Sequence, residues 1–363
     1  MLRVDVDARM LEAGGIGRYI REIVGPWLAS GQLEAARFYG HPSQLEAWLT
    51  RIDARGDVDI VPWHDRIYGL AAQVRWPMSL HRLRGWQPDV TLFPHFDVPL
   101  VAHPSPSVVV VHDLIHLRLP EAFSGWKRLL AAGMVRRAAS LADRIITVSE
   151  SSRRHIVDFL GRAHPPIEVI RNGVSDLFTP GAQTVRKLPP YVLVVAPHKP
   201  HKNLQFALRV LHQLPEREGW RLLAVGPDYA DRDALVRDVA LPPLARRIEL
   251  PGPVGDGALR DLYRQAEAVL VPSLLEGFAL PALEARACGA RVLVPALSWA
   301  RELSHAGVEL IDGWDPRRWA RAVCTPPPDA EARGAVPVVP RWSEASTATL
   351  RVLEKVAAEP VSG

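Results

Sequence analysis

Short apolar runs alternate with longer amphipathic stretches along most of the chain. Residues 2–7 alternate apolar and polar side chains as a half-buried strand does, while 107–111 is almost wholly apolar, as in a strand buried on both faces. Helical patterns separate such runs, and this alternation predicts parallel sheets with helices packed on them. In the first half we expect strands at 2–7, 35–39, 57–61, 89–93, 107–111, 143–148 and 167–170, with helices at 43–50 and 67–84 among the connecting segments.

The second half of the chain shows the same alternation. The polar segment 176–190, which contains proline and glycine, is the predicted linker. A chain of 363 residues is too long for one core, so we expect an α/β protein with two doubly wound, Rossmann-like domains at 1–176 and 177–342. An amphipathic helix is predicted at 342–356. The strands expected in the second half are 191–196, 221–226, 247–250, 268–271, 291–294 and 308–311.

Composition excludes several classes of protein. Hydrophobic residues at 48% and charged residues at 23% are typical of a globular chain. No apolar run reaches the roughly eighteen residues that predict a membrane span. The charged N-terminus lacks the apolar core of a signal peptide, so we expect the protein in the cytoplasm. The two cysteines, Cys288 and Cys324, lack the spacing of a zinc site or a redox pair.

A net charge of +4 and an isoelectric point near 9.3 suit an anionic partner, which includes nucleic acid, anionic lipid and phosphorylated substrates. No basic run with interleaved aromatic residues matches a nucleic-acid-binding motif. Nucleic acid is therefore not an expected partner, and lipid and phosphorylated substrates stay open.

The segment 272–289 carries the most information about chemistry. The apolar run 268–271 predicts a buried strand that Pro272 ends, because proline cannot continue a strand ladder. Pro281 has a fixed φ that suits the first turn of a helix, and Gly289 allows the left-handed turn that stops one. The segment therefore predicts a strand, a loop and a short helix in succession.

Two carboxylates and a helix start come together in this segment. Glu276 lies before the predicted helix and Glu284 one turn inside it. The backbone amides of Phe278, Ala279 and Leu280 would point out of the positive end of the helix, where a phosphate binds readily. Carboxylates accept hydrogen bonds from vicinal hydroxyls. The combination suits a diphosphate with a sugar at each end, which is a nucleotide-sugar; the alternative is two solvated glutamates on an ordinary surface helix.

The full segment resembles the Glu-x7-Glu motif of the retaining glycosyltransferases of family 4, in which Pro-Ser precedes Glu-Gly-Phe-Gly-Leu-Pro and Glu-Ala-x-Ala-Cys-Gly. Here Ala279 replaces the middle glycine and Arg286 the usual apolar residue, and both carboxylates remain. The resemblance implies the GT-B fold, in which two Rossmann-like domains face a central cleft. It also implies that the first domain binds the acceptor, that the second binds the nucleotide-sugar, and that the C-terminal helix at 343–363 packs back on the first domain.

A glycine-rich turn follows the first strand and opens a helix that we expect to end near residue 28. Glycines there allow either close approach of the backbone to a ligand or tight packing. The string around Gly15, Gly17 and Tyr19 resembles the family's first-loop pattern Gly-Gly-x-Gly-x-Tyr. The resemblance implies that Gly15 lies at the donor and that Gly17 lies on the acceptor side.

Histidines follow two strands of the first half. His112 and Asp113 lie at the carboxyl end of the strand 107–111, where open α/β sheets place ligands. A lone histidine is more often structural, but this pair matches the family's His-Asp segment, which faces the donor sugar. His95 and His116 are acceptor-side candidates in the same cleft. His95 and His116 could also form a metal site, although Asp and His side chains from separate loops give no recognised ligand spacing.

Lys202 follows the first strand of the second half. Its segment resembles the family's Pro-Arg-Lys-Asn-Leu segment, with His201 in place of arginine. The resemblance implies that Lys202 neutralises the diphosphate, while His201 supplies a pH-dependent second cation or none. Family members hold the base mainly through backbone groups near Val254. Asp231 and Asp233 have the Asp-x-Asp form of metal-dependent glycosyltransferases of another fold, but they open a predicted helix and are interpreted as its cap.

The sequence therefore predicts a retaining glycosyltransferase of polysaccharide biosynthesis. We expect Glu276 to hold the hydroxyls of the donor sugar, Glu284 the ribose, and His112 the sugar near its reacting carbon. Lys202 and the amides at 278–280 would stabilise charge on the leaving diphosphate, without a metal or other cofactor.

The motifs most resemble those of bacterial enzymes that transfer mannose from GDP-mannose, and the expected acceptor is a glycan or a saccharide linked to a lipid diphosphate. A UDP-sugar donor is the alternative within this fold. A non-catalytic sugar-nucleotide-binding protein and a polyanion-binding protein are two further hypotheses. The intact glutamates and lysine disfavour the former, and the missing nucleic-acid motif disfavours the latter.

Two segments of the first half, 66–86 and 121–137, mix large apolar side chains with basic ones. This pairing favours peripheral binding to an anionic membrane surface, and the alternative is that both segments pack on the sheet. The residues concerned are Trp76, Met78, Trp86, Trp126, Leu129, Leu130 and Met134, beside Arg75, Arg82, Arg84, Lys127, Arg128, Arg136 and Arg137.

Overall fold

The computed structural model describes residues 1–63, 69, 85–100, 106–162, 164–181, 189–229, 231–238, 241–325 and 339–359. The chain divides into two compact units, one of Met1–Gly173 with Trp342–Gly363 and one of Val174–Arg341. The predicted helix at 67–84, and with it most of the segment 66–86, lies outside the described residues, apart from residue 69.

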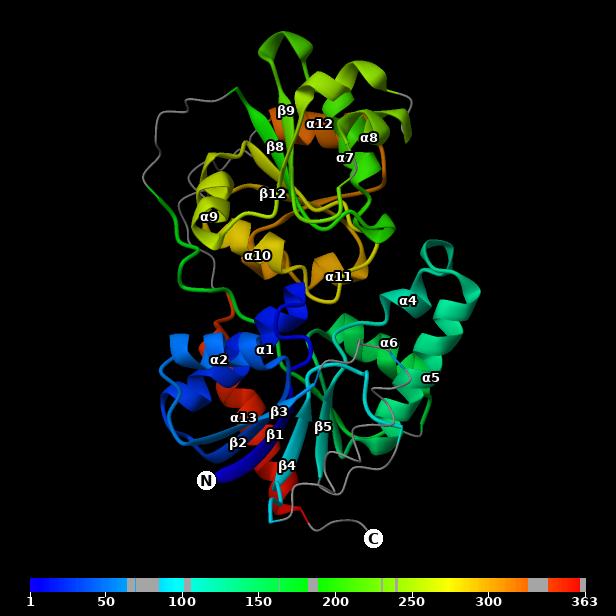
Figure 1. The fold of residues 1–363 in the computed structure, drawn as a ribbon. Helices are drawn as coiled ribbons and strands as arrows, with labels where there is room; N and C mark the ends of the chain where they lie inside the picture. The colour runs from blue at the N-terminus through cyan, green and yellow to red at the C-terminus, as the bar shows by residue number, and fades with distance from the viewer. Residues whose placement is uncertain are drawn as a thin grey trace. The chain divides into compact units, whose positions relative to one another are not determined.

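A parallel sheet of seven strands in the order β3-β2-β1-β4-β5-β6-β7 forms the centre of the first unit (Figure 1). The predicted strands of this half are confirmed, and their ends shift by one or two residues. Strands β4 and β5 are buried along their whole length, which explains their apolar sequences. The strands are β1 (Leu2–Asp7), β2 (Leu33–Gly40), β3 (Asp57–Pro62), β4 (Val90–Phe93), β5 (Ser107–Val110), β6 (Arg144–Thr147) and β7 (Ile167–Val169).

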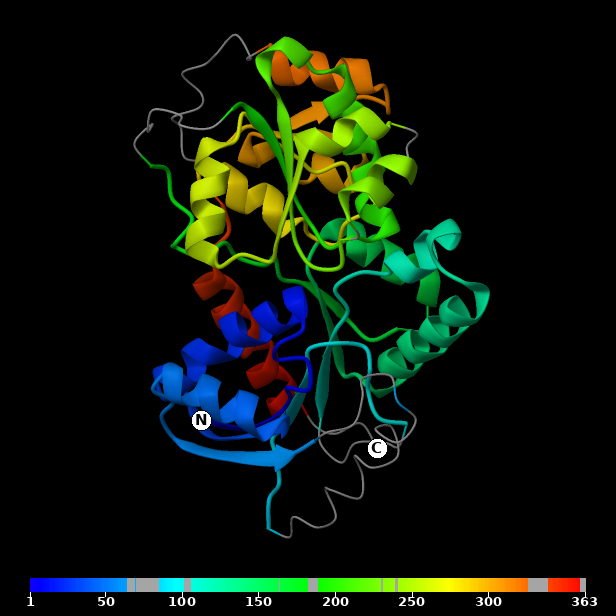
Figure 2. The same ribbon diagram turned by 45° about the horizontal axis from the view of Figure 1, so that its top comes forward.

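The C-terminal helix α13 (Trp342–Ala358) belongs to the first unit, where it lies beside α1 (Gly14–Ala29) in both ribbon views (Figures 1 and 2). Two hydrogen bonds join the helices: Trp27 Nε1 donates to the carbonyl of Ser346 over 3.2 Å, and the Ser346 hydroxyl donates to the carbonyl of Ile23 over 2.7 Å. Residues that are more than 300 positions apart in sequence thus share one core.

The other helices of the first unit include α6 (Glu150–Leu160), which begins at a side-chain cap. The Ser149 hydroxyl accepts a hydrogen bond from the amide of Ser152 over 3.0 Å and so caps this helix. These helices are α2 (Pro42–Arg51), α4 (Ile115–Arg118), the 3-10 turn η1 (Pro120–Ala122), α5 (Gly125–Leu141) and α6 (Glu150–Leu160).

A second parallel sheet, with six strands in the order β10-β9-β8-β11-β12-β13, forms the centre of the second unit. The predicted strands of this half are confirmed. Strand β9 lies on one side of β8, and β11 lies on its other side. The chain therefore reverses direction across the sheet at β8, and the loops after β8 and β11 are neighbours at the carboxyl edge. The strands are β8 (Tyr191–Val195), β9 (Arg221–Val225), β10 (Ile248–Gly252), β11 (Ala268–Leu270), β12 (Val292–Pro295) and β13 (Glu309–Ile311).

Helices cover both faces of this sheet (Figure 1). Asp231 Oδ1 accepts a hydrogen bond from the amide of Ala234 over 2.8 Å, so Asp231 caps α8 as predicted. The helices are η2 (Pro200–Lys202), α7 (Leu204–Gln213), η3 (Glu216–Glu218), α8 (Arg232–Asp238), η4 (Pro242–Arg247), α9 (Asp256–Gln265), α10 (Leu280–Ala287), α11 (Ser298–Arg301), η5 (Ser304–Ala306) and α12 (Pro316–Cys324). Among the described residues, no helix is long and apolar enough to cross a membrane.

Candidate functional site

Lys202 and Glu276 form an ion pair at the carboxyl edge of the second sheet. Lys202 ends the turn η2 after β8, and Glu276 lies in the loop between β11 and α10. The ammonium Nζ lies 2.7 Å from one carboxylate oxygen and 2.8 Å from the other. Only 17% of the lysine side chain and 8% of the glutamate side chain are exposed. The sequence singled out both residues, but it did not predict that they contact each other.

The loops that carry this pair are joined through the backbone. The amide of Leu274 donates to the carbonyl of His201 over 2.8 Å, which fixes the lysine loop against the glutamate loop. Asn203, the residue after Lys202, takes a left-handed conformation at φ 52°, which asparagine tolerates better than most residues, and α7 begins directly after it. His201 is buried, with 7% of its surface exposed. The pair is thus held by a rigid turn and a cross-loop hydrogen bond.

Helix α10 begins where the sequence predicted. Pro281 lies in its first turn, and Gly289 after its end takes φ 81°. The residue before the helix, Ala279, has φ 57° and ψ 52°, a left-handed conformation that costs a non-glycine residue roughly 1–2 kcal/mol. This is the position of the middle glycine in the glycosyltransferase motif that the segment resembles. In the described part of the chain no backbone carbonyl accepts from the amides of Phe278 and Ala279.

The second glutamate of the motif is buried against α9. Only 3% of the surface of Glu284 is exposed, and its Oε2 accepts a hydrogen bond from the hydroxyl of Tyr263 over 3.1 Å. Tyr263 is fully buried, and its ring packs edge-on against Phe178 at 5.9 Å. Tyr263 was not predicted as a site residue, because nothing in its local sequence indicates a contact with a residue on another helix.

Arg286 points into the protein and not toward solvent. Its guanidinium donates to the carbonyls of Ala306 and Ala290, each over 2.9 Å, and burial lowers its pKa. The arginine that replaces the usual apolar residue of the motif therefore ties α10 to the next loops of the second unit.

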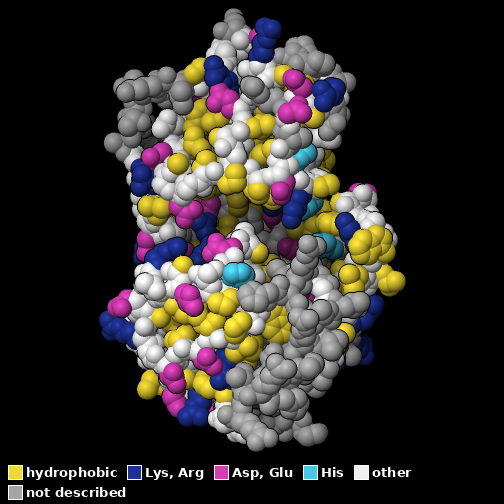
Figure 3. Space-filling model, in the orientation of Figure 1, with side chains coloured by type: hydrophobic (Ala, Val, Ile, Leu, Met, Phe, Trp, Pro, Cys, Tyr) yellow, Lys and Arg dark blue, Asp and Glu magenta, His cyan; other side chains and the backbone are white. Residues whose placement is uncertain are grey.

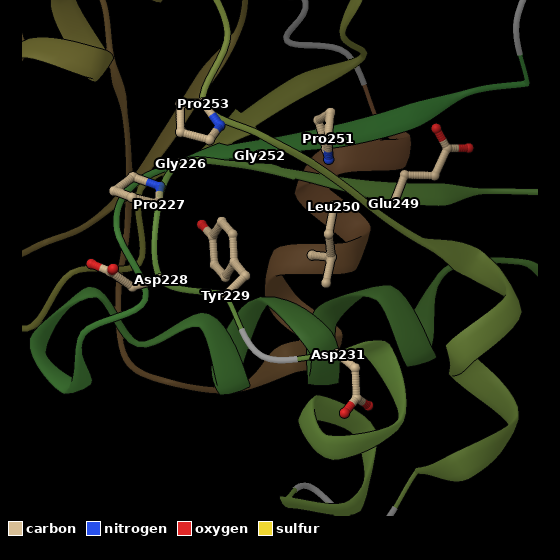
Figure 4. Close-up of a pocket in the computed structure, with 10 residues that line it drawn as sticks. All are labelled: Gly226, Pro227, Asp228, Tyr229, Asp231, Glu249, Leu250, Pro251, Gly252 and Pro253. Carbon is tan, nitrogen blue, oxygen red and sulfur yellow. The ribbon is translucent and has the colours of Figure 1, made fainter.

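A pocket of about 680 Å³ opens at the carboxyl ends of β9 and β10 (Figure 4). The ring of Tyr229 projects into it, the Tyr229 hydroxyl donates to the carbonyl of Ala196 over 2.5 Å, and the ring of His198 stacks on Tyr229 at 5.8 Å. Val254 directly follows the lining residues. The lining consists of Gly226, Pro227, Asp228, Tyr229, Asp231, Glu249, Leu250, Pro251, Gly252 and Pro253.

His112 lies after β5 in the first unit. Its Nε2 is 3.0 Å from the carbonyl oxygen of Pro94, which can only accept, so Nε2 carries the proton and Nδ1 is the bare acceptor. The ring of Tyr19 meets the imidazole edge-on at 4.9 Å. Burial lowers the pKa of His112, although the carboxylate of Asp113 acts in the opposite direction. The neutral imidazole with a bare Nδ1 is therefore the form favoured at neutral pH.

His95 and His116 belong to the same group as His112. Nδ1 of His95 accepts from the amide of Asp97 over 3.1 Å. Burial lowers the pKa of His95 well below the ordinary value, and the positive charges that His112, Arg9 and His116 can carry lower it further. The structure thus brings together the three histidines that the sequence singled out, at the carboxyl ends of β4 and β5.

The ring of His116 lies against Phe123 at 4.5 Å. Nowhere in the described ranges do three or more histidine, cysteine, aspartate or glutamate side chains form a group that could hold a metal ion. His95 and His116 are not part of such a group in the described part of the chain.

The two glycines of the first loop differ in their surroundings. Gly15 is exposed, and a Cβ atom there would meet nothing within 4 Å. Gly17 is buried, and a Cβ there would lie 2.2 Å from the carbonyl oxygen of Leu11. The structure therefore gives Gly17 a packing role, which lets α1 approach the preceding loop, and leaves Gly15 open to solvent.

A buried charge cluster that was not predicted from the sequence lies at the carboxyl ends of β1 and β4. The Arg9 guanidinium donates from Nε and Nη2 to the two carboxylate oxygens of Asp7 over 2.9 and 2.7 Å. The same group lies 3.4 Å from the carboxylate of Asp97 and donates to its carbonyl over 2.8 Å. The available signal was that Asp7 ends β1 and Asp97 follows β4, and these two strands are neighbours.

Two Rossmann-like units, with the glutamate motif at the start of α10, define a glycosyltransferase of the GT-B type. Residues 13–176 match the family model described as Glycosyltransferase Family 4, and residues 189–325 match the model described as Glycosyl transferases group 1. The chain belongs to this family of glycosyltransferases.

Relatives and solved structures agree with this assignment. A D-inositol 3-phosphate glycosyltransferase of Mycobacterium sp. strain JLS is 31% identical over 85% of this chain and 68% of its own length. A glycogen synthase of Mycobacterium tuberculosis strain H37Rv is 29% identical over 60% of this chain and 55% of its own length.

Two solved structures show the same fold. Sucrose-phosphate synthase from Thermosynechococcus elongatus superposes with a TM-score of 0.74 at 17% identity, covering 99% of this chain and 100% of that one. Anabaena Alr3699/HepE in complex with UDP-glucose superposes with a TM-score of 0.70 at 17% identity, covering 98% of each chain.

Proposed function

We propose that this glycosyltransferase moves a hexose from a nucleoside-diphosphate donor onto a glycan or lipid-linked saccharide with retention of configuration. The observation that carries the proposal is the ion pair of Lys202 and Glu276 beside the start of α10. An ammonium, a carboxylate, and two amides that have no backbone acceptor in the described chain match a diphosphate joined to a sugar.

Each group in the second unit has a role in the proposed reaction. The acceptor hydroxyl attacks the anomeric carbon, the bond from that carbon to the diphosphate oxygen breaks, and the departing diphosphate takes the hydroxyl proton. Lys202 and the amides of Phe278 and Ala279 stabilise the charge that grows on the diphosphate. Glu276 accepts from hydroxyls of the donor sugar, and Glu284, which Tyr263 orients, accepts from the ribose.

The first unit contributes His112. Its Nε2–H is held by the carbonyl of Pro94, which leaves Nδ1 to accept a hydrogen bond from a hydroxyl of the sugar. The proposed mechanism assigns this histidine to sugar recognition and not to proton transfer, because a lowered pKa favours its neutral form.

GDP-mannose is the proposed donor, on the resemblance of the motifs to those of mannosyltransferases. UDP-glucose is the competing donor, because a solved structure with the same fold is a complex with UDP-glucose. A panel of radiolabelled nucleotide-sugars, scored by release of nucleotide and by label in the product, separates them. The acceptors to be tested are lipid-linked saccharides and D-inositol 3-phosphate. The latter is included because one relative is named a D-inositol 3-phosphate glycosyltransferase. Turnover with UDP-sugars alone would contradict the GDP-mannose assignment.

The role of Lys202 is tested by Lys202→Ala, with Lys199→Ala as the matched control. Lys199 is an exposed lysine three positions away in the same loop. Calorimetry with the nucleoside diphosphate should show a loss of roughly 1.5–3 kcal/mol, or about 10- to 150-fold, for Lys202→Ala, because a charge-assisted contact is removed. Lys199→Ala should bind like the wild type. Unchanged affinity in a folded Lys202→Ala variant would show that this lysine does not meet the diphosphate.

A peripheral membrane role is part of the proposal, because an apolar patch is exposed at the start of α5. Trp126 is 65% exposed, Leu129 75% and Leu130 47%, and Lys127 lies over the Trp126 ring at 5.6 Å. Figure 3 shows hydrophobic side chains beside basic ones over α4 and α5. This pairing favours anionic lipid.

Two of the arginines expected to support membrane binding also make contacts within the protein. Arg136 lies 4.7 Å from the ring of Phe159, and Arg137 donates to the carbonyls of Pro99 and Leu100.

A further inference from the structure

Lys202 and Glu276 bind each other through the same atoms that the proposed donor needs. The ammonium faces both oxygens of the carboxylate, at 2.7 and 2.8 Å. A diphosphate requires the ammonium, whereas a sugar hydroxyl requires a carboxylate oxygen. A ligand that takes only one partner leaves the other without its counter-charge in a site where 8% of the glutamate and 17% of the lysine are exposed. A buried charge without a partner is strongly unfavourable.

We infer that this ion pair couples recognition of the diphosphate to recognition of the sugar, so that the enzyme favours the complete nucleotide-sugar over the nucleoside diphosphate product. The inference rests on the proposed function. When a nucleoside diphosphate binds, Lys202 pairs with its phosphates, and the carboxylate of Glu276 remains buried without a counter-charge. The complete donor draws Lys202 to its phosphates and replaces the lost ammonium at Glu276 with hydroxyl donors of the sugar.

The architecture supports an exchange of side-chain partners without separation of the loops. The amide of Leu274 holds the carbonyl of His201 at 2.8 Å, and the turn at Asn203 begins α7 directly. The two loops that carry the pair are therefore joined through the backbone, and the proposed exchange of partners involves only the side chains of Lys202 and Glu276. Transfer of the sugar removes the hydroxyl donors from Glu276, after which Lys202 and Glu276 pair again and favour release of the product.

The coupling predicts that Glu276→Gln binds the nucleoside diphosphate more tightly than the wild type does. Glutamine keeps the shape of glutamate but holds the ammonium less firmly, so Lys202 reaches the phosphates without leaving a charge behind. We expect a gain of about fivefold or more in nucleoside-diphosphate affinity and a loss in nucleotide-sugar affinity. The ratio of nucleotide-sugar affinity to nucleoside-diphosphate affinity should therefore fall, and the nucleoside diphosphate should inhibit turnover more strongly.

The experiment is calorimetry on the full chain with GDP and GDP-mannose, and with UDP and UDP-glucose, for the wild type and for Glu276→Gln, Lys202→Ala, Lys202→Gln and Lys199→Ala. Circular dichroism verifies the fold of each variant, and Lys202→Gln replaces Lys202→Ala where the latter does not fold. Product inhibition of turnover by the same diphosphate provides a second readout. Lys199→Ala controls for the loss of a positive charge in the same loop.

The outcomes separate the two proposals. Unchanged diphosphate affinity in a folded Lys202 variant overturns the proposed phosphate contact. Weaker diphosphate binding in the Lys202 variants, with no gain in Glu276→Gln, leaves that contact standing and overturns the coupling. In that case the three N–H donors of the ammonium serve phosphate and carboxylate together. A gain in Glu276→Gln with a reduced ratio supports the coupling.

Discussion

The carboxyl group of Asp5 makes the stability of the first unit depend on pH. Asp5 lies in the middle of β1, is fully buried, and accepts hydrogen bonds from the hydroxyl of Tyr39 over 2.9 Å and from Nε1 of Trp86 over 2.8 Å. Burial raises its pKa from 3.8 to about 6, against the opposing effects of these hydrogen bonds and of Arg37, while Asp59 adds to the increase. The native state therefore holds this proton more tightly than the unfolded state does.

The magnitude follows from the difference in pKa. About two pKa units between the unfolded and folded states correspond to roughly 3 kcal/mol. The native pKa is the higher one, so the stabilisation from this group is fully present below pH 3.8 and is lost as the pH rises through about 6. Above that window the ionised carboxylate remains buried, and the fold is weaker by this amount.

An asparagine side chain has no charge to bury, so the variant Asp5→Asn should become more stable relative to the wild type as the pH rises. The amide loses one acceptor, which costs about 1 kcal/mol at every pH. We therefore expect the variant to be about 1 kcal/mol less stable near pH 3.5 and about 2 kcal/mol more stable at pH 8.

Urea unfolding of the wild type and variant at a series of pH values between 3.5 and 8, followed by tryptophan fluorescence, measures this difference. Asp57→Asn, at the exposed start of β3, is the matched control and should show no comparable trend. A difference between Asp5→Asn and the wild type that stays constant with pH would refute the reasoning.

Three further predictions concern the second unit and the membrane. Ala279→Gly should raise the free energy of unfolding by roughly 1 kcal/mol in thermal melts, because glycine takes φ 57° without strain; a destabilised variant would contradict this account. Turnover should survive exhaustive chelation, whereas activity that chelators abolish and Mg²⁺ restores would reopen Asp231 and Asp233 as ligands. In flotation assays the protein should move with anionic vesicles at low salt, remain behind with neutral ones, and detach as salt rises. The double substitution Trp126→Ser with Leu129→Ser should abolish that binding. If the wild-type protein does not bind anionic vesicles at low salt, the membrane proposal is wrong.

The sequence alone was sufficient for the features that local physics controls. The strands of both sheets follow from apolar runs of strand length. The ends of α10 follow from Pro281, whose fixed φ suits the first turn, and from Gly289, which can adopt the positive φ that ends the helix. The caps at Ser149 and Asp231 were predictable for the same reason, since a cap bonds a residue three positions away. The chemical candidates came from motif resemblance, which keeps residue types and spacing together.

Only the tertiary structure decided how these residues meet. Lys202 and Glu276 are 74 positions apart, and their contact depends on β8 and β11 being neighbours in the sheet. The contact of Tyr263 with Glu284 requires α9 and α10 to pack together, and the need for glycine at position 17 comes from the carbonyl of Leu11. Local sequence limits which conformations a segment adopts, whereas the partner of a buried charge or ring is set by strand order and helix packing, which involve the whole chain.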